Sequence, residues 1–213
     1  MPLFRRHLLL LVLLLAAQPA MAIEEPVFAV LHSTEDYEIR RYAPYIVAEV
    51  DVEGELNEVG GDAFRILAGY IFGKNEPGTK MSMTAPVTSQ PAGERMQMTA
   101  PVISDAPTSG RDSHTFAFVM ESRYSMETLP KPIDPRIRIV EKPAQVLAAR
   151  RYSGRWSDKN FRKHEAALLA ALQTDAVEML GEIYLARYNS PFTPWFLRRN
   201  ELLVEVAWAL PDR

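Results

Sequence analysis

The chain has 213 residues, of which 47% are hydrophobic and 24% charged, and its formal net charge is −3 at pH 7. These values are typical of a globular domain and exclude a disordered or fibrous protein. The acidic balance argues against nucleic-acid binding, which needs a basic face. Because the chain contains no cysteine, disulfides, thiolate metal ligands and a cysteine nucleophile are excluded as well.

Residues 1–22 have the pattern of a secretory signal peptide. A basic pair is followed by an apolar run over 8–17, too short to span a bilayer, and then by an Ala-Met-Ala cleavage site ending at Ala22. We therefore expect a periplasmic or secreted protein with no stable membrane anchor after cleavage. The basic pair leaves both general secretion and twin-arginine export open.

The first half of the remaining chain combines strands with one helix. Apolar residues at helical spacing predict a helix over 55–72, which Gly73 ends in the manner of a helix C′ residue. Alternating β-branched and aromatic residues predict strands over 27–32, 37–42, 45–52 and 115–120.

A short tandem repeat lies between the helix and the last of these strands. The sequence Met-Ser-Met-Thr-Ala-Pro-Val over 81–87 returns as Met-Gln-Met-Thr-Ala-Pro-Val over 96–102. Two similar segments joined by a linker with proline and glycine predict a hairpin, with its prolines at bulges or edges. Alternation places Met81 and Met83 on one face, where they are either adaptable core filler or a soft pocket lining.

The second half repeats the first at an offset of about 100 residues, as shown by Ile39 and Ile139. It predicts a helix over 157–173 and strands over 137–140, 146–152, 182–187 and 202–208. Such a duplication, about 27–120 and 136–208, predicts one pseudo-two-fold domain over 23–213. We expect an α+β fold made of a duplicated βαββ unit, with an antiparallel sheet or distorted barrel and two packed helices.

A proline- and aromatic-rich segment over 188–201 precedes the last strand. Pro191 and Pro194 remove backbone donors and push the residues before them out of the helical region, which predicts a fixed, extended loop. A loop of this composition either covers a core or rims a pocket.

Five motifs together carry a resemblance to a known family. They are Tyr-Glu-Ile-Arg at 37–40, Tyr-Ile-Phe-Gly-Lys-Asn at 70–75, Met-Thr-Ala-Pro-Val at 83–87, Leu-Pro-Lys-Pro at 129–132 and the segment 188–201. In this order they resemble the SOUL haem-binding protein family, and the chain is identified as an exported bacterial member. The resemblance implies the same duplicated fold and the binding of haem or another tetrapyrrole in a hydrophobic groove beside the first helix.

The resemblance also implies which residues contact the ligand. Leu67 and Ala68 match the groove positions on the first helix. An axial histidine follows the Tyr-Glu-Ile-Arg motif in vertebrate members, but the residue here is Arg41, which stays protonated and cannot ligate iron. Basic side chains are expected to pair with the haem propionates, because guanidinium groups bind carboxylates through two hydrogen bonds. The predicted cofactor-binding residues are Arg40, Arg41, Phe64, Arg65, Leu67, Ala68, Ile71, Lys74, Met81 and Met83.

The sequence therefore favours a non-enzymatic protein that binds haem non-covalently as a carrier, buffer or scavenger, with no axial ligand identified. One alternative is a module for another apolar or cationic small molecule on the same fold. Another is a hydrolase or lyase, motivated by Glu201 and Glu205, which alternation places on one strand face. His32, His114 and His164 are isolated in the sequence, so we predict neither a metal site nor catalytic residues.

Overall fold

The computed structural model describes residues 23–54, 56–76, 93–106 and 113–209. The predicted signal peptide, Met81 and Met83 lie outside these ranges. Among the described residues, no helix has both the length and the apolar character needed to cross a membrane.

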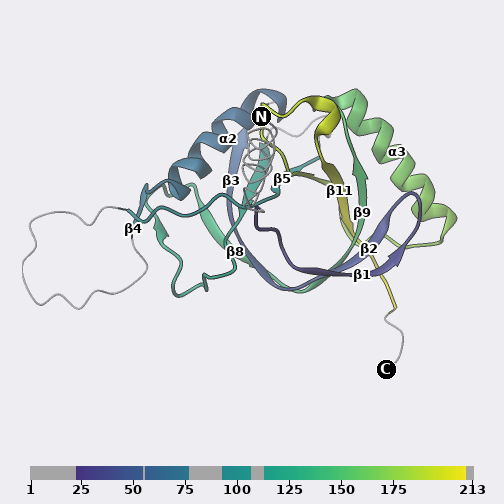
Figure 1. Ribbon diagram of the computed structural model, residues 1–213, viewed down its shortest axis with the longest axis horizontal. Coiled ribbons are helices and arrows are strands. Elements are labelled where there is room, and N and C mark those ends of the chain that lie inside the picture. Colours follow the sequence, from purple (N-terminus) through teal and green to yellow (C-terminus); the bar gives the residue numbers. More distant parts are fainter. Residues whose placement is uncertain (1–22, 55, 77–92, 107–112, 210–213) are drawn as a thin grey trace, which may run out of the picture.

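Nine of the strands form one antiparallel sheet that curls strongly (Figure 1). Their bounds are β1 Phe28–Ser33, β2 Glu38–Tyr42, β3 Tyr45–Glu53, β5 Val102–Asp105, β6 Ser113–Val119, β8 Arg138–Lys142, β9 Gln145–Tyr152, β10 Tyr184–Arg187 and β11 Asn200–Glu205. A separate pair consists of β4 (Asn75–Glu76) and β7 (Lys131–Pro132). The α+β fold predicted from the sequence is confirmed.

The strand order is symmetric about the β10–β5 pair except for β1. It runs β1-β2-β9-β11-β10-β5-β6-β3-β8, so that β11, β9 and β2 follow outward from β10 as β6, β3 and β8 follow outward from β5, and β1 has no counterpart. One strand of each half pairs with the other half, since β2 lies beside β9 and β8 lies beside β3. This exchange makes the two halves one structural unit, while the internal duplication itself stays a prediction.

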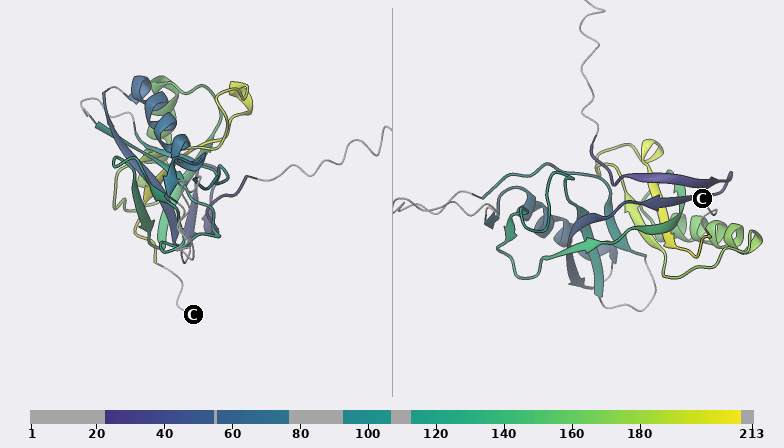
Figure 2. Two further views of the ribbon diagram at one scale, coloured as in Figure 1. Left: turned by 90° about the vertical axis from the view of Figure 1, so that its left-hand side faces the viewer. Right: turned by 90° about the horizontal axis from the view of Figure 1, so that it is seen from below.

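Two helices cover the outer face of the curl, on opposite sides (Figures 1 and 2). The helix α2 (Leu56–Ile71) packs on β3 and β6, and α3 (Asp158–Thr174) packs on β9 and β11. Ser157 accepts a hydrogen bond from the Asn160 backbone N–H and thereby caps the start of α3. A short 3₁₀ helix, η1 (Trp195–Leu197), lies in the predicted extended loop.

Each helix buries one apolar stripe. The inward residues of α2 are spaced by three and four positions, and full burial of such a side chain contributes about 1.5–3 kcal/mol. They are Ala63, Leu67, Tyr70 and Ile71 in α2, matched by Phe161, Leu168 and Leu172 in α3.

Two glycines end corresponding strands. Gly54 follows β3 with a φ of 117°, and Gly154 follows β9 with a φ of 124°. Side chains with a Cβ rarely adopt this conformation, so glycine allows the chain to turn sharply from each strand toward its helix.

The hairpin predicted from the methionine repeat is wrong in its described part. Residues 96–101 form no strand, and β5 begins only at Val102. The Met96 N–H instead donates to the Ile71 carbonyl oxygen at 2.8 Å, and the Thr99 hydroxyl donates to the Val119 carbonyl oxygen. These contacts satisfy polar groups that a ladder would otherwise pair.

Candidate functional site

A row of side chains across four strands forms the floor of a groove on the outer face. Register pairs Phe118 with Val102, Val102 with Arg187, and Arg187 with Asn200. Because side chains alternate between faces, Arg187 lies on the same face as Leu185, which packs under α3. The floor therefore places a cation at the end of β10, within an otherwise mostly apolar row.

The wall on one side is the first half of α2. Gly60 and Gly61 face the groove, and Phe64 meets Phe118 edge-to-face with ring centroids 5.4 Å apart. A Cβ at Gly60 would reach Phe116 at 3.6 Å, and one at Gly61 would meet nothing within 4 Å. A glycine in a helix interior destabilises the helix by about 1 kcal/mol relative to alanine. The two glycines therefore leave the groove open at the expense of helix stability.

The opposite wall is Trp156, which precedes α3, and the segment after β10. The Trp156 indole N–H donates to the Asn200 amide oxygen at 2.7 Å. The guanidinium carbons of Arg187 and Arg198 lie 5.1 and 4.3 Å from the centre of its ring. These contacts hold the indole in one orientation beside the groove.

The groove encloses about 450 Å³, within the range of roughly 300–1,000 Å³ that small-molecule sites occupy. Six of its lining residues carry apolar or aromatic side chains, and one is charged. The lining consists of Gly60, Gly61, Phe64, Val102, Phe116, Phe118, Trp156, Arg187, Asn189 and Pro191.

Arg187 is the unusual residue of this site. Its buried Nε atom has no hydrogen-bond partner among the described residues, and they offer it no ion pair. Burial lowers the pKa of Arg187 below its ordinary value, although a guanidinium remains charged. A desolvated cation without a carboxylate is unfavourable, so the site is suited to a ligand that brings a negative group.

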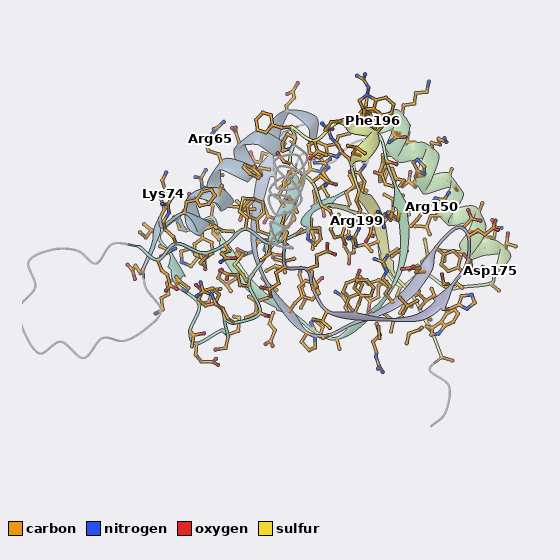
Figure 3. All side chains as sticks on the ribbon, in the orientation of Figure 1. Arg65, Lys74, Arg150, Asp175, Phe196 and Arg199 are labelled. Atoms are coloured by element: carbon orange, nitrogen blue, oxygen red, sulfur yellow. The ribbon has the colours of Figure 1, made fainter. Side chains whose placement is uncertain are left out.

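A contrasting arginine cluster lies on the inner face of the curl. Glu201, which is fully buried, accepts hydrogen bonds from Arg40 at 2.7 Å, from Arg199 at 3.0 Å and from the Tyr188 hydroxyl at 2.8 Å. Burial alone raises the pKa of the Glu201 carboxyl, but Arg40 and then Arg199 outweigh it and hold that pKa below its ordinary value. Figure 3 shows Arg199 inside the curl.

The four predicted propionate partners do not meet at the groove. Arg40 forms an ion pair with Glu201 in the inner cluster, and Arg41 is exposed on β2. Arg65, with 78% of its side chain exposed, pairs with Asp62, and Lys74 lies in a separate depression near the end of α2 (Figure 3).

The predicted apolar contacts divide into two groups. Phe64 lines the groove, whereas Leu67, Ala68 and Ile71 are buried in the core beneath α2. The two methionines of the prediction fall outside the described residues. The assignment of all ten residues as ligand contacts stays a prediction.

Sequence reasoning missed Arg187 and Trp156. Arg187 follows Leu185 at the alternate position of a strand, which indicates that the two share a face but not that the face opens into a groove. Trp156 precedes the predicted helix by one residue and gave no signal of its own. Only the pairing of β10 with β5 and β11 brings both to α2.

Glu201, which alternation placed on one strand face with Glu205, does not lie on a solvent-exposed face. Leu203 shares its inner face, as alternation predicted, but the curl of the sheet covers this part of β11. Only Glu205, near the open end, is exposed.

Comparison with known proteins gives relatives of similar length. Human heme-binding protein 2 is 27% identical over 177 residues, which cover 78% of this chain and 79% of the relative. Mouse heme-binding protein 2 is 27% identical over 179 residues, covering 79% and 81%.

Solved structures with little sequence identity share the fold. An uncharacterized conserved protein from Listeria innocua aligns with a TM-score of 0.58 at 13% identity, covering 82% of this chain and 93% of that one. The EcmrR C-terminal domain aligns with a TM-score of 0.58 at 10% identity, covering 81% and 99%. A hydrolase from Listeria innocua aligns with a TM-score of 0.53 at 13% identity, covering 83% and 94%.

The model of one protein family, described as SOUL heme-binding protein, matches residues 23–205. This match spans both helices and every strand of the large sheet. The chain belongs to the SOUL heme-binding family.

Proposed function

We propose that this protein binds haem or another carboxylate-bearing tetrapyrrole, non-covalently, in the groove between α2 and residues 187–191. The observation that carries the proposal is an apolar-walled groove of about 450 Å³ that contains an arginine without a carboxylate partner. A tetrapyrrole ring is flat and apolar and carries acidic side chains at its edge. Its ring would pack on Phe64, Phe116 and Phe118, and a propionate would pair with Arg187.

The donor set of the groove fits the ring and its carboxylates rather than the iron. Among the described residues that line it, none is a histidine, methionine, cysteine or tyrosine, the usual axial ligands of haem iron. Affinity would then come from apolar contact and charge pairing, and a metal-free porphyrin would bind about as well as haem.

The groove does not favour the alternative of a cationic ligand. Its one charged side chain among the described lining residues is itself a cation. Glu201, which could have attracted a cation, lies on the opposite face of the sheet and is paired with Arg40 and Arg199.

We extend the proposal to role and location. The family consists of binding proteins, and a carrier, buffer or scavenger of tetrapyrroles needs no catalytic group. The secretory pattern of residues 1–22 supports a protein that acts in the periplasm or outside the cell.

The test is an absorption titration of the purified protein with hemin and, separately, with metal-free protoporphyrin. We expect a saturable shift of the Soret band with both, at one ligand per chain. A Gly60→Leu variant fills the groove and should abolish the shift, whereas Ala166→Leu, on the exposed face of α3, should leave it unchanged. If the parent gives no saturable shift, or if Gly60→Leu binds as well as the parent while folded, the proposal fails.

A further inference from the structure

The segment between β10 and β11 exposes a cluster of large apolar side chains. Phe192 is 95% exposed, Leu197 64%, Phe196 59% and Trp195 49%. We call these four residues the aromatic tip. The segment that carries them protrudes at one end of the molecule beside the start of α3 (Figures 1 and 2), and Phe196 lies at this edge (Figure 3). Contiguous exposed apolar groups of this kind mark interaction surfaces on soluble proteins.

The backbone beneath the aromatic tip is held by hydrogen bonds. The Leu197 N–H donates to the Pro194 carbonyl oxygen at 2.9 Å. The Arg198 guanidinium donates to the carbonyl oxygens of Thr193 at 2.8 Å and Pro191 at 2.7 Å. Two prolines further restrict the chain. The aromatic tip therefore exposes its side chains from a loop whose backbone is restricted by hydrogen bonds.

Four cations lie on the Trp195 side of the aromatic tip. Arg151, Arg155, Lys159 and Lys163 are all exposed and border, together with Trp195, one shallow depression of about 690 Å³. None of the four forms an ion pair with a carboxylate of the described residues. This basic group stands on a chain whose net charge is −3.

The aromatic tip and the cations are fastened to each other. The guanidinium carbon of Arg155 lies 5.8 Å from the centre of the Trp195 ring. The Gly154 N–H donates to the Trp195 carbonyl oxygen at 3.1 Å. These two contacts hold Trp195 beside Arg155, so the tip and the basic group adjoin at this point.

We propose that this surface docks reversibly on a membrane of anionic phospholipids. Tryptophan and phenylalanine side chains partition into the interface between headgroups and acyl chains, where one end of the indole stays polar. Lysine and arginine beside them are attracted by the negative surface potential of the lipid phosphates. Charge complementarity therefore selects an anionic bilayer as the occupant.

A second copy of the chain fits this surface less well. A two-fold contact places the same patch of each copy against the other. It would bring the cations of both copies together, while no carboxylate is among the described residues that line the depression. The membrane proposal is independent of haem binding, although Asn189 and Pro191 of the groove belong to the same segment, so docking would bring the groove close to the bilayer.

The first experiment measures cosedimentation with vesicles. The full chain is expressed, recovered in the form the cell produces, and checked by mass spectrometry, so that any retained residues 1–22 are common to parent and variants. We expect binding to vesicles of equal parts phosphatidylcholine and phosphatidylglycerol, weak binding to phosphatidylcholine alone, and loss of binding at 1 M salt, where the Debye length is about 3 Å.

Variants separate the two parts of the surface. The double change Trp195→Ser with Phe196→Ser should lower the partition coefficient by roughly tenfold or more. Lys163→Gln should lower it roughly fivefold. The matched controls are Leu180→Ser, an exposed apolar residue elsewhere, and Lys131→Gln, an exposed cation on β7. Both controls should bind as the parent does.

Tryptophan quenching by brominated acyl chains then locates the contact. Quenching should be strong in the parent, should persist in Trp208→Phe, and should fall in Trp195→Phe although that variant still sediments with vesicles. Binding that the tip variants do not weaken would overturn the proposal. So would a dimer, detected by light scattering without lipid, that the Trp195→Ser and Phe196→Ser changes dissociate.

Discussion

Two arginines on opposite faces of the same sheet have opposite surroundings. Arg40, on the inner face, shares the carboxylate of Glu201 with Arg199, and its guanidinium also reaches Glu38 at 2.7 Å. Arg187, on the outer face, packs beside the aromatic ring of Trp156, and its buried Nε atom has no hydrogen-bond partner among the described residues. Arg40 is buried and Arg187 is partly buried, but only the charge of Arg40 is compensated by a carboxylate of the described residues. The inner arginine is paired within the fold, whereas the outer one is the residue for which we propose a ligand carboxylate as partner.

We expect the largest effect on stability from removing the carboxylate of Glu201. Glu201→Gln leaves Arg40 with only the partly exposed Glu38 and Arg199 with only the partly exposed Glu25. Loss of one partner of a buried ion pair costs about 3–5 kcal/mol. We expect this fall in the free energy of unfolding from urea denaturation. The control is Asp62→Asn, which removes an exposed partner of Arg65 and should cost less than about 1 kcal/mol. Equal losses in the two variants would contradict the role given to Glu201.

Replacing Arg187 should lower ligand affinity without lowering the free energy of unfolding. Arg187→Met removes the charge that would meet a propionate, so we expect hemin affinity to fall by about 1.5–3 kcal/mol, roughly ten- to a hundredfold. Its stability should hold or rise, because an uncompensated buried charge is removed. Arg65→Met, exposed on α2, should change neither quantity.

A porphyrin without carboxylates sharpens this test. It should bind the parent and Arg187→Met equally, because it offers nothing for the guanidinium to pair with. If Arg187→Met weakens both porphyrins alike, the arginine shapes the groove instead of recognising a carboxylate.

Low pH should destabilise the fold through the Glu201 carboxylate of the inner face. The pKa of Glu201 in the folded state lies below its ordinary value of 4.5. The carboxylate therefore stabilises the fold above that ordinary value, and this contribution is lost as the pH falls through the folded-state pKa. We expect the free energy of unfolding of the parent to decline below about pH 4.5 more steeply than that of Glu201→Gln. Parallel pH profiles would contradict this assignment.

The smallest expected effect concerns the helix wall of the groove. A Cβ at Gly61 meets nothing within 4 Å, and Gly61 lies within α2. Gly61→Ala should therefore raise the free energy of unfolding by about 0.5–1 kcal/mol. An unchanged stability would show that this position is not limited by helix propensity.

The predictions from sequence were accurate where the signal is local. Alternation located eight of the nine strands of the large sheet to within a few residues and missed β5, and helical spacing located α2 and α3. Two exceptions are β4 and β7, which are only two residues long. A third is the segment over 96–101, which donates hydrogen bonds to carbonyl oxygens at the end of α2 and at the end of β6. Short or irregular pairings leave no periodic pattern to detect.

The site could be predicted only in part. The family resemblance indicated the groove beside the first helix, and Phe64 lines it. Arg40 was expected to serve the ligand because it is basic and belongs to a family motif. Its actual partner lies 161 positions away in the sequence, and no local pattern specifies such a distance.

The sequence by itself determined both helices, most strands of the large sheet, the glycines that end β3 and β9, and the family to which the chain belongs. Those properties depend on backbone propensity and side-chain periodicity, which act over a few residues. Tertiary structure alone decided that Glu201 neutralises Arg40 and Arg199, and that Arg187 faces a groove. These outcomes depend on strand register and on the curl of the sheet, since together they set which charges are brought together and which are left for a ligand.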